Sequence, residues 1–157
     1  MKGKIAGGAI VATGLIAGIV MYYLQVYGFY DRLPETAGEE LTLTNLATGA
    51  PEPMLVEAFE GIDASSSPLR YRACFTTPMS VAMLTETFVT YDAPEPLVAP
   101  GWFSCFDAGR IGADLENGTA FAFLSRAEIH DGVDRVIAVY EDGRAFAWHQ
   151  LNEKFRD

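Results

Sequence analysis

The sequence predicts an α+β protein with a single N-terminal transmembrane helix, followed by a small domain with an antiparallel sheet and two short helices. Three observations lead to this prediction. Residues 5–24 form a run of 20 uncharged residues. Short segments in which apolar and polar residues alternate recur after residue 40, and an Asp-Gly pair joins the last two of them. About 125 residues follow the anchor, which is enough for one domain.

The apolar run at 5–24 is long enough to cross a membrane. At about 1.5 Å per residue it covers the roughly 30 Å of a bilayer core. Lys2 and Lys4 precede it, and the positive-inside rule places residues 1–4 in the cytoplasm and the domain on the other side of the lipid bilayer. A cleaved signal peptide is the alternative. Its apolar run is usually about 7–15 residues, and only a weak cleavage site at 26–28 follows here.

One stripe of this helix is lined by the small residues Gly7, Gly14 and Gly18. Their spacing places them on one face, and Gly14 and Gly18 form a GxxxG pair that lets a second helix approach closely. With one span in this chain, that helix must come from another molecule. A homodimer and docking onto a larger membrane protein are both open, although glycine is also simply frequent in membrane helices.

The segment 25–40 predicts a juxtamembrane linker, because it is largely polar and contains Pro34 and Gly38. The domain is expected at 41–157. Residues 41–44 alternate with period two, and so do residues 70–76. Both are expected to be strands. The two faces of the second strand carry different side chains: Tyr71, Ala73 and Phe75 on one, and Arg70, Arg72 and Cys74 on the other, where we expect the arginines to be solvated.

The helices and the later strands are predicted from caps and turns. Thr77 and Pro78 suit the start of a short helix that ends near Leu84. A second helix at 107–116 ends at the Asn117-Gly118 cap. We expect both helices on one side of the sheet. Further segments complete the domain: strands at 86–91 and 119–125, a proline-rich loop at 93–101, and a hairpin of 136–140 with 145–149, whose Asp-Gly pair suits a two-residue turn.

Cys74 and Cys105 are the only cysteines of the chain. Two cysteines in a small domain outside the cytoplasm suggest one disulfide. Two free buried thiols, or a redox or metal-binding pair, remain as alternatives. His130 and His149, the only histidines, could join such a metal site, but their spacing matches no recurrent ligand pattern, and a surface or hydrogen-bonded histidine is the simpler interpretation.

The other motifs do not indicate catalysis. Ser65, Ser66 and Ser67 lie in a loop without the setting of a nucleophile elbow. The glycines at 109–112 lack the lysine and the strand–loop–helix context of a phosphate-binding loop. We therefore expect that the protein is not an enzyme and that it holds no metal and no cofactor.

The charge of the chain favours particular partners. The net charge is −10, and beyond Lys2 and Lys4 the chain has 9 basic and 21 acidic residues. Such a domain would repel phosphates, which argues against nucleic acid as a partner. It would instead attract a basic soluble protein at the membrane surface. Solubility alone would also account for the charge.

Four segments form a recognisable combination: the helix exit at 22–27, the strand at 71–75, the turn at 101–106 and the Trp148-His149-Gln150 ending. Together they resemble a group of uncharacterised single-pass membrane proteins of alphaproteobacteria. The resemblance implies a bacterial inner membrane with the C-terminal domain in the periplasm. It implies no reaction and no catalytic residues.

These observations predict a non-catalytic accessory subunit, or an assembly or stability factor, of an inner-membrane complex. The respiratory chain is the first expectation: a cytochrome oxidase, a bc-type complex or their supercomplex. A basic soluble cytochrome would then meet the acidic domain. A membrane-anchored periplasmic sensor or chaperone that binds a metal or another ligand is the alternative.

Overall fold

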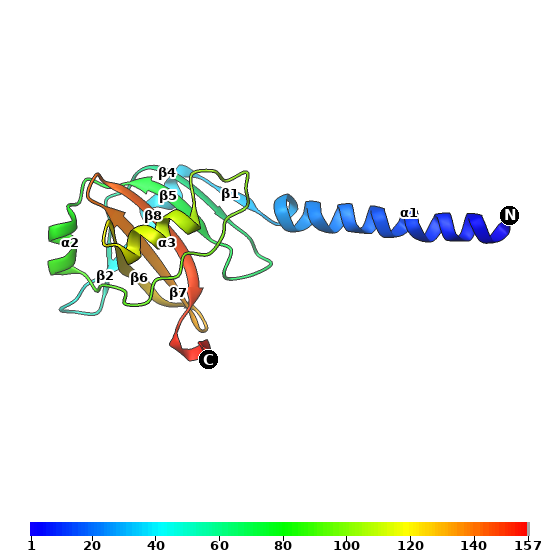
Figure 1. The fold of residues 1–157 in the computed structure, drawn as a ribbon. Coiled ribbons are helices and arrows are strands. Elements are labelled where there is room, and N and C mark those ends of the chain that lie inside the picture. Colours follow the sequence, from blue (N-terminus) through cyan, green and yellow to red (C-terminus); the bar gives the residue numbers. More distant parts are fainter. Residues whose placement is uncertain (157) are drawn as a thin grey trace. The chain divides into compact units, whose positions relative to one another are not determined.

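The computed structural model describes residues 1–156, which divide into two compact units. The first comprises Met1–Tyr30 and the second begins at Asp31. The first unit is the helix α1 (Lys2–Tyr23), which continues into the π-helical turn η1 (Leu24–Gly28) (Figure 1). Its mean hydropathy of 2.0 and its exposed side chains make it long and apolar enough to cross a membrane, a test that a signal sequence also passes. The expected span at 5–24 lies within it.

The second unit is built on one six-stranded antiparallel sheet. Its strands have the order β1-β4-β5-β8-β7-β6. Their bounds are β1 (Asp31–Leu33), β4 (Glu57–Asp63), β5 (Arg72–Thr76), β6 (Ala120–His130), β7 (Val133–Tyr140) and β8 (Arg144–Leu151). A separate hairpin consists of β2 (Thr42–Thr44) and β3 (Pro51–Pro53). The predicted α+β fold with an antiparallel sheet is confirmed.

One face of the sheet carries the main hydrophobic core. The β2–β3 hairpin, the 3₁₀ helix η2 (Glu35–Glu40) and the helix α2 (Val81–Thr87) cover it. Leu41, Leu84 and Phe123 are each 0% exposed there. The Ser125 hydroxyl donates to the Thr42 carbonyl over 2.6 Å and thereby ties the hairpin to β6.

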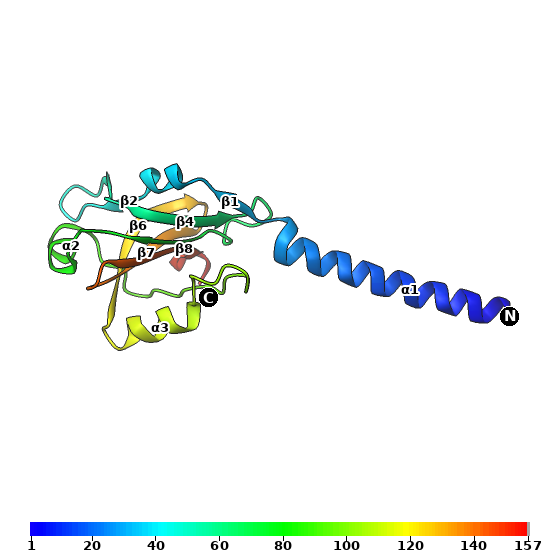
Figure 2. The same cartoon turned by 90° about the horizontal axis from the view of Figure 1, so that it is seen from above.

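The opposite face is covered by the helix α3 (Ala108–Glu116) and by residues 93–107, which we call the strap. Phe106 of the strap packs edge-on against Trp148 of β8, with ring centroids 6.4 Å apart. The Tyr140 hydroxyl donates to Asp114 of α3 over 2.8 Å. The two helices therefore lie on opposite faces, and the expectation of one shared side was wrong; Figure 2 shows α3 and β2 on different sides of the sheet.

The structure differs from the expected linker at residues 31–40. Asp31–Leu33 pairs with β4, and Leu33 lies opposite Gly61. Gly38 of η2 is buried, and a Cβ there would lie 2.9 Å from Val56 and 3.0 Å from Phe59. These residues belong to the domain because Leu33 and Ala37 pack against its core. Pro34 precedes η2, and Gly38 marks a close approach of the backbone to Val56 and Phe59.

The first short helix begins later than expected. Ser80, not Thr77, is the N-cap of α2, and its hydroxyl accepts from the Met83 amide over 3.3 Å. Thr77 is 4% exposed, and its backbone N–H donates to the Gly143 carbonyl. That bond holds Thr77 at the β7–β8 turn, so the helix cannot start there. The expected strand at 86–91 is also wrong, since residues 86 and 87 belong to α2 and the rest of the segment makes the isolated bridges Asn45–Phe88 and Thr90–Phe123.

The second helix and the hairpin are confirmed. Asp107 caps α3 by accepting from the Arg110 amide over 3.1 Å, and Gly118 follows the helix with a φ of +79°. The β7–β8 turn holds residues 141–143, three rather than the expected two. Gly143 has a φ of +90°, the left-handed residue that a three-residue hairpin loop requires.

Candidate functional site

The glycine stripe of α1 leaves open space beside the helix. Gly7, Gly14 and Gly18 are exposed, and a Cβ built on any of them would meet no atom of the described chain within 4 Å. A second helix could therefore approach the backbone closely along this stripe. The described chain places nothing on it, so the association stays a prediction.

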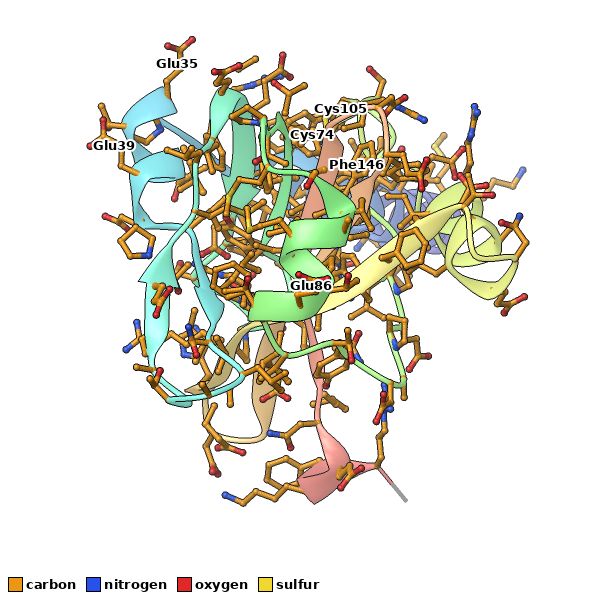
Figure 3. The ribbon with its side chains drawn as sticks, turned by 90° about the vertical axis from the view of Figure 1, so that its left-hand side faces the viewer. Glu35, Glu39, Cys74, Glu86, Cys105 and Phe146 are labelled. Carbon is orange, nitrogen blue, oxygen red and sulfur yellow. A yellow bond between two sulfur atoms is a disulfide. The ribbon has the colours of Figure 1, made fainter. Side chains whose placement is uncertain are left out.

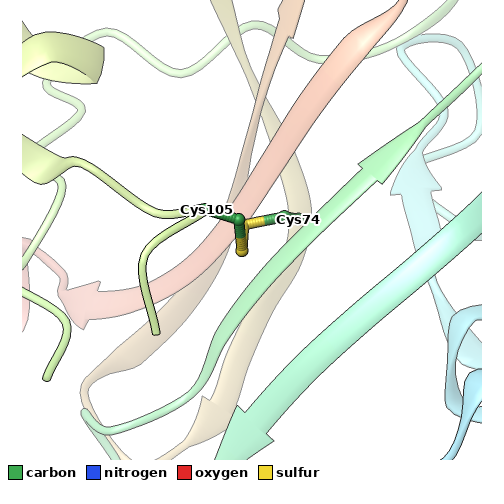
Figure 4. Close-up of a disulfide and its surroundings, with 2 residues drawn as sticks. All are labelled: Cys74 and Cys105. Atoms are coloured by element: carbon green, nitrogen blue, oxygen red, sulfur yellow. A yellow bond between two sulfur atoms is a disulfide. The ribbon is translucent and has the colours of Figure 1, made fainter. Parts of the chain in front are cut away.

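Cys74 and Cys105 form a disulfide (Figure 4). Their Cα atoms lie 6.3 Å apart, and 31 positions separate them in sequence. Cys74 sits on β5 and Cys105 in the strap, so the bond ties the strap to the sheet. Neither sulfur remains for a thiol or metal-thiolate role, and the pair acts as a structural crosslink.

Arg72 is buried, which corrects the expectation that it lies on a solvated strand face. It is 4% exposed. Its guanidinium donates to the carbonyls of Leu97 (2.8 Å) and Val98 (3.2 Å) in the strap and to those of Leu69 and Tyr71 (both 2.6 Å). The strap covers this face of the sheet, and the alternation of β5 cannot reveal that cover.

Gln150 fixes the beginning of the strap. Its side chain is 1% exposed; the carbonyl oxygen accepts from the Glu95 amide over 2.7 Å, and the amide group donates to the Ala93 carbonyl over 3.0 Å. The strap is thus held at three places: by Gln150 at its start, by Arg72 at its middle and by the disulfide at Cys105. A segment anchored this way has a defined position against the sheet.

The two histidines lie together, which residue spacing did not predict. Their ring centroids are 5.9 Å apart, with His130 exposed and His149 only 1% exposed. His149 Nε2 lies 3.0 Å from Arg135 Nε, which can only donate, so Nδ1 carries the proton and donates to the Pro68 carbonyl over 2.7 Å. Tyr71 stacks on the imidazole at 4.6 Å.

This cluster is arranged for structure rather than for proton transfer. Burial, and then the charge of Arg135, lower the pKa of His149 to about 3. Its one lone pair is already occupied by Arg135. Within residues 1–156 no group of three His, Cys, Asp or Glu side chains is placed to hold a metal ion.

Acid should weaken the fold through His149. Unfolded histidine binds its proton near pH 6.5, whereas the folded side chain does so only near pH 3. Stability that is present above pH 6.5 is therefore lost as the pH falls toward 3, by up to about tenfold in the folding equilibrium per pH unit. Urea unfolding midpoints between pH 7 and 4 measure this loss. His149→Gln should flatten the pH dependence; equal slopes for wild type and His149→Gln would contradict the assignment.

A polar pocket of about 400 Å³ lies beside the C-terminal residues. In its wall the Tyr91 hydroxyl donates to Asp134 over 3.1 Å, and Asp134 also accepts from the Glu128 amide and the Asn152 side chain. Burial raises the pKa of Tyr91 to about 12, with the Asp134 charge as the next cause. Its phenol is therefore held protonated, and the network fixes the chain end to β6 and β7.

A second groove, of about 600 Å³, lies between α3 and the start of the strap. Its walls are mostly apolar, from Pro94 and Pro96 on one side and Gly112, Ala113 and Leu115 on the other. No motif in the sequence marked this groove. It exists because the strap and α3 are brought to the same face of the sheet.

The comparisons with known proteins show a family but no activity. No curated protein and no solved structure matches the chain. Residues 41–157 match DUF6446, which is described as a family of unknown function. This agrees with the resemblance to uncharacterised proteins. Because the match covers most of the chain, the protein belongs to the DUF6446 family.

Proposed function

We propose that the protein is a non-catalytic accessory subunit, or an assembly or stability factor, of an inner-membrane complex. One observation carries the proposal: an exposed apolar helix with an open glycine stripe is joined in one chain to a domain whose buried polar groups are committed to structure. His149, Arg72 and Asp134 each bond to neighbouring groups of the fold. Among the described residues, no buried side-chain nitrogen or oxygen lacks a hydrogen-bond partner.

The orientation in the membrane is part of the proposal. Lys2 and Lys4 support a cytoplasmic N-terminus, and the disulfide supports a domain in the oxidising periplasm. The oxidation state of the cysteine pair in intact, acid-quenched cells tests this orientation. A pair that resists alkylation until a reductant is added agrees with it, and free thiols would overturn it.

Within the inner membrane we propose the respiratory chain as the host. The domain's charge supports this: residues 33–69 contain seven acidic side chains and no Lys, Arg or His. Glu35 and Glu39 project from η2 on the exposed surface of the domain (Figure 3). A basic soluble cytochrome would be drawn to such a surface and would bind less well at high salt. Absence of any oxidase or cytochrome complex from the purified protein would refute this host.

Association through α1 should depend on the glycine stripe. Gly14→Leu with Gly18→Leu fills the space in which a second helix would pack, so we expect the tagged full-length protein to lose its membrane partners in mild detergent. Mass spectrometry of the co-purified subunits measures this. Gly8→Leu with Ala12→Leu is the matched control, because it enlarges two residues four apart on another face of the same helix.

The outcomes are distinct. Stoichiometric host subunits with the wild type and the control, but not with the stripe variant, support the accessory subunit and name its host. Recovery of the wild-type protein alone would contradict the proposal. Equal recovery of host subunits with both variants would mean that the protein binds its host through a surface other than the glycine stripe.

A sensor or chaperone is the second candidate, and the polar pocket of about 400 Å³ favours its ligand-binding form. The disulfide argues against the form that uses the cysteines as metal ligands. A small polar ligand retained on native purification, and lost with Asp134→Asn, would support this candidate; a pocket that retains none would count against it.

A further inference from the structure

The groove between α3 and the strap has the features of a preformed binding surface. Both walls are fixed without a ligand: Gln150 holds the strap at Ala93 and Glu95, and α3 is held by the buried Ile111 and by the bond from Tyr140 to Asp114. A groove that is already in place costs little conformational entropy to fill.

The α3 wall of the groove has room that the chain itself does not use. Gly112 lies in the middle of α3, where glycine destabilises a helix relative to alanine. A Cβ at Gly112 would meet no atom within 4 Å. Nothing in the domain therefore requires glycine at this position, whereas a side chain entering from outside would gain the space.

The rim of the groove is acidic. Asp92 and Glu95 line it from the strap side and Glu116 from the end of α3. All three are exposed, and the residues that line the groove include no Lys, Arg or His. Glu95 pairs with Arg156 over 3.6 Å, whereas Asp92 and Glu116 form no ion pair within residues 1–156. Apolar walls with carboxylates at the rim complement an aliphatic side chain flanked by cationic ones.

We propose that this groove docks a basic segment of a partner protein. One aliphatic side chain of that segment enters over Gly112, and its neighbouring lysines or arginines meet the carboxylates of the rim. The inference rests on the proposed function, because it needs a partner, and it adds the surface by which the periplasmic domain holds that partner. It is distinct from the helix contact at the glycine stripe.

The test uses the full-length protein in an uncharged detergent and a fluorescent peptide of sequence Lys-Lys-Ala-Leu-Ala-Lys-Lys. Fluorescence anisotropy gives its dissociation constant. Gly112→Trp should weaken binding about tenfold or more by filling the groove. Gly101→Trp is the matched control, since a Cβ there also meets nothing within 4 Å and Gly101 lies outside the groove; it should change binding less than about twofold.

Two further measurements separate a groove from general attraction between charges. Asp92→Asn with Glu116→Gln leaves the pair of Glu95 with Arg156 in place and should weaken binding and reduce its dependence on salt. A peptide with serine in place of leucine should bind about tenfold more weakly. Equal affinity for the serine peptide, or for Gly112→Trp and Gly101→Trp, would overturn the proposal. Thermal unfolding confirms that each variant is folded.

Co-purification distinguishes this inference from the proposed function. Host subunits recovered with wild type and Gly101→Trp, but reduced with Gly112→Trp, support both. Equal recovery with all three would retain the proposed function and refute the groove. Recovery of no host subunits with the wild type would refute the proposed function. If Gly112→Trp changes the oligomeric state of the protein itself, the groove binds a second copy of this chain, and the proposal of a basic partner is wrong.

Discussion

Replacing Cys74 and Cys105 by serine should lower the free energy of unfolding by about 3–4 kcal/mol. The bond closes a loop of 31 positions, and the chain-entropy model gives this value for a loop of that length. For a domain of this size the loss corresponds to a drop of roughly 10–15 °C in melting temperature. Circular dichroism during heating measures it.

The wild type in reducing buffer is the natural comparison. Reduction should lower its melting temperature toward that of the serine variant, and the serine variant should not respond to reductant. A serine variant as stable as the oxidised wild type would show that the strap is held by its other contacts alone, and the crosslinking role of the pair would be wrong.

Arg72→Met should destabilise the domain by about 3 kcal/mol or more. The guanidinium satisfies four backbone carbonyls at a site that is 4% exposed, and methionine leaves these acceptors without a donor. Arg72→Lys should restore little, because one ammonium cannot reproduce the planar fork of five donors. Urea unfolding gives the free energy of each variant.

Arg126→Met is the matched control. Arg126 lies on the same sheet, in β6, but is exposed, so its loss should change stability by less than about 0.5 kcal/mol. An Arg72→Met variant no less stable than this control would mean that the strap carbonyls find water or other donors, and that Arg72 does not hold the strap.

Features that depend on neighbouring residues could be predicted from the sequence. The Asn117-Gly118 pair marked the end of α3 at Glu116, since a capping residue acts on the backbone next to it. The Asp142-Gly143 turn located the last hairpin. That hairpin also pairs Arg135 with His149, so extending the strands would have placed these two side chains together before the structure was known.

Features that depend on distant segments could not be predicted in this way. The alternation of β5 correctly separates Arg72 from Tyr71, Ala73 and Phe75, but it cannot show that the strap covers the second face. The segment at 31–40 looked like a linker because it is largely polar and contains Pro34 and Gly38, whereas its place in the fold comes from pairing with β4. The groove likewise arises only where α3 meets the strap.

The candidate sites also differ in whether they depend on neighbouring residues or on distant segments of the chain. The disulfide could be predicted from the presence of two cysteines and the expectation of an oxidising compartment. The glycine stripe was visible in the spacing of residues 7, 14 and 18, and the structure leaves it open. The acidic groove, and the contacts of His149 with Tyr71 and Pro68, required the sheet order, because their members come from strands and loops far apart in sequence.

The native mass of the protein solubilised from its own membranes tests the central claim most directly. We predict that the wild type and the Gly8→Leu, Ala12→Leu control migrate on a native gel with an assembly much larger than the 17.1 kDa chain. The Gly14→Leu, Gly18→Leu variant should run at the mass of the free chain in detergent. Wild-type protein that runs as a free monomer in mild detergent would contradict the claim that it is a subunit of a membrane complex.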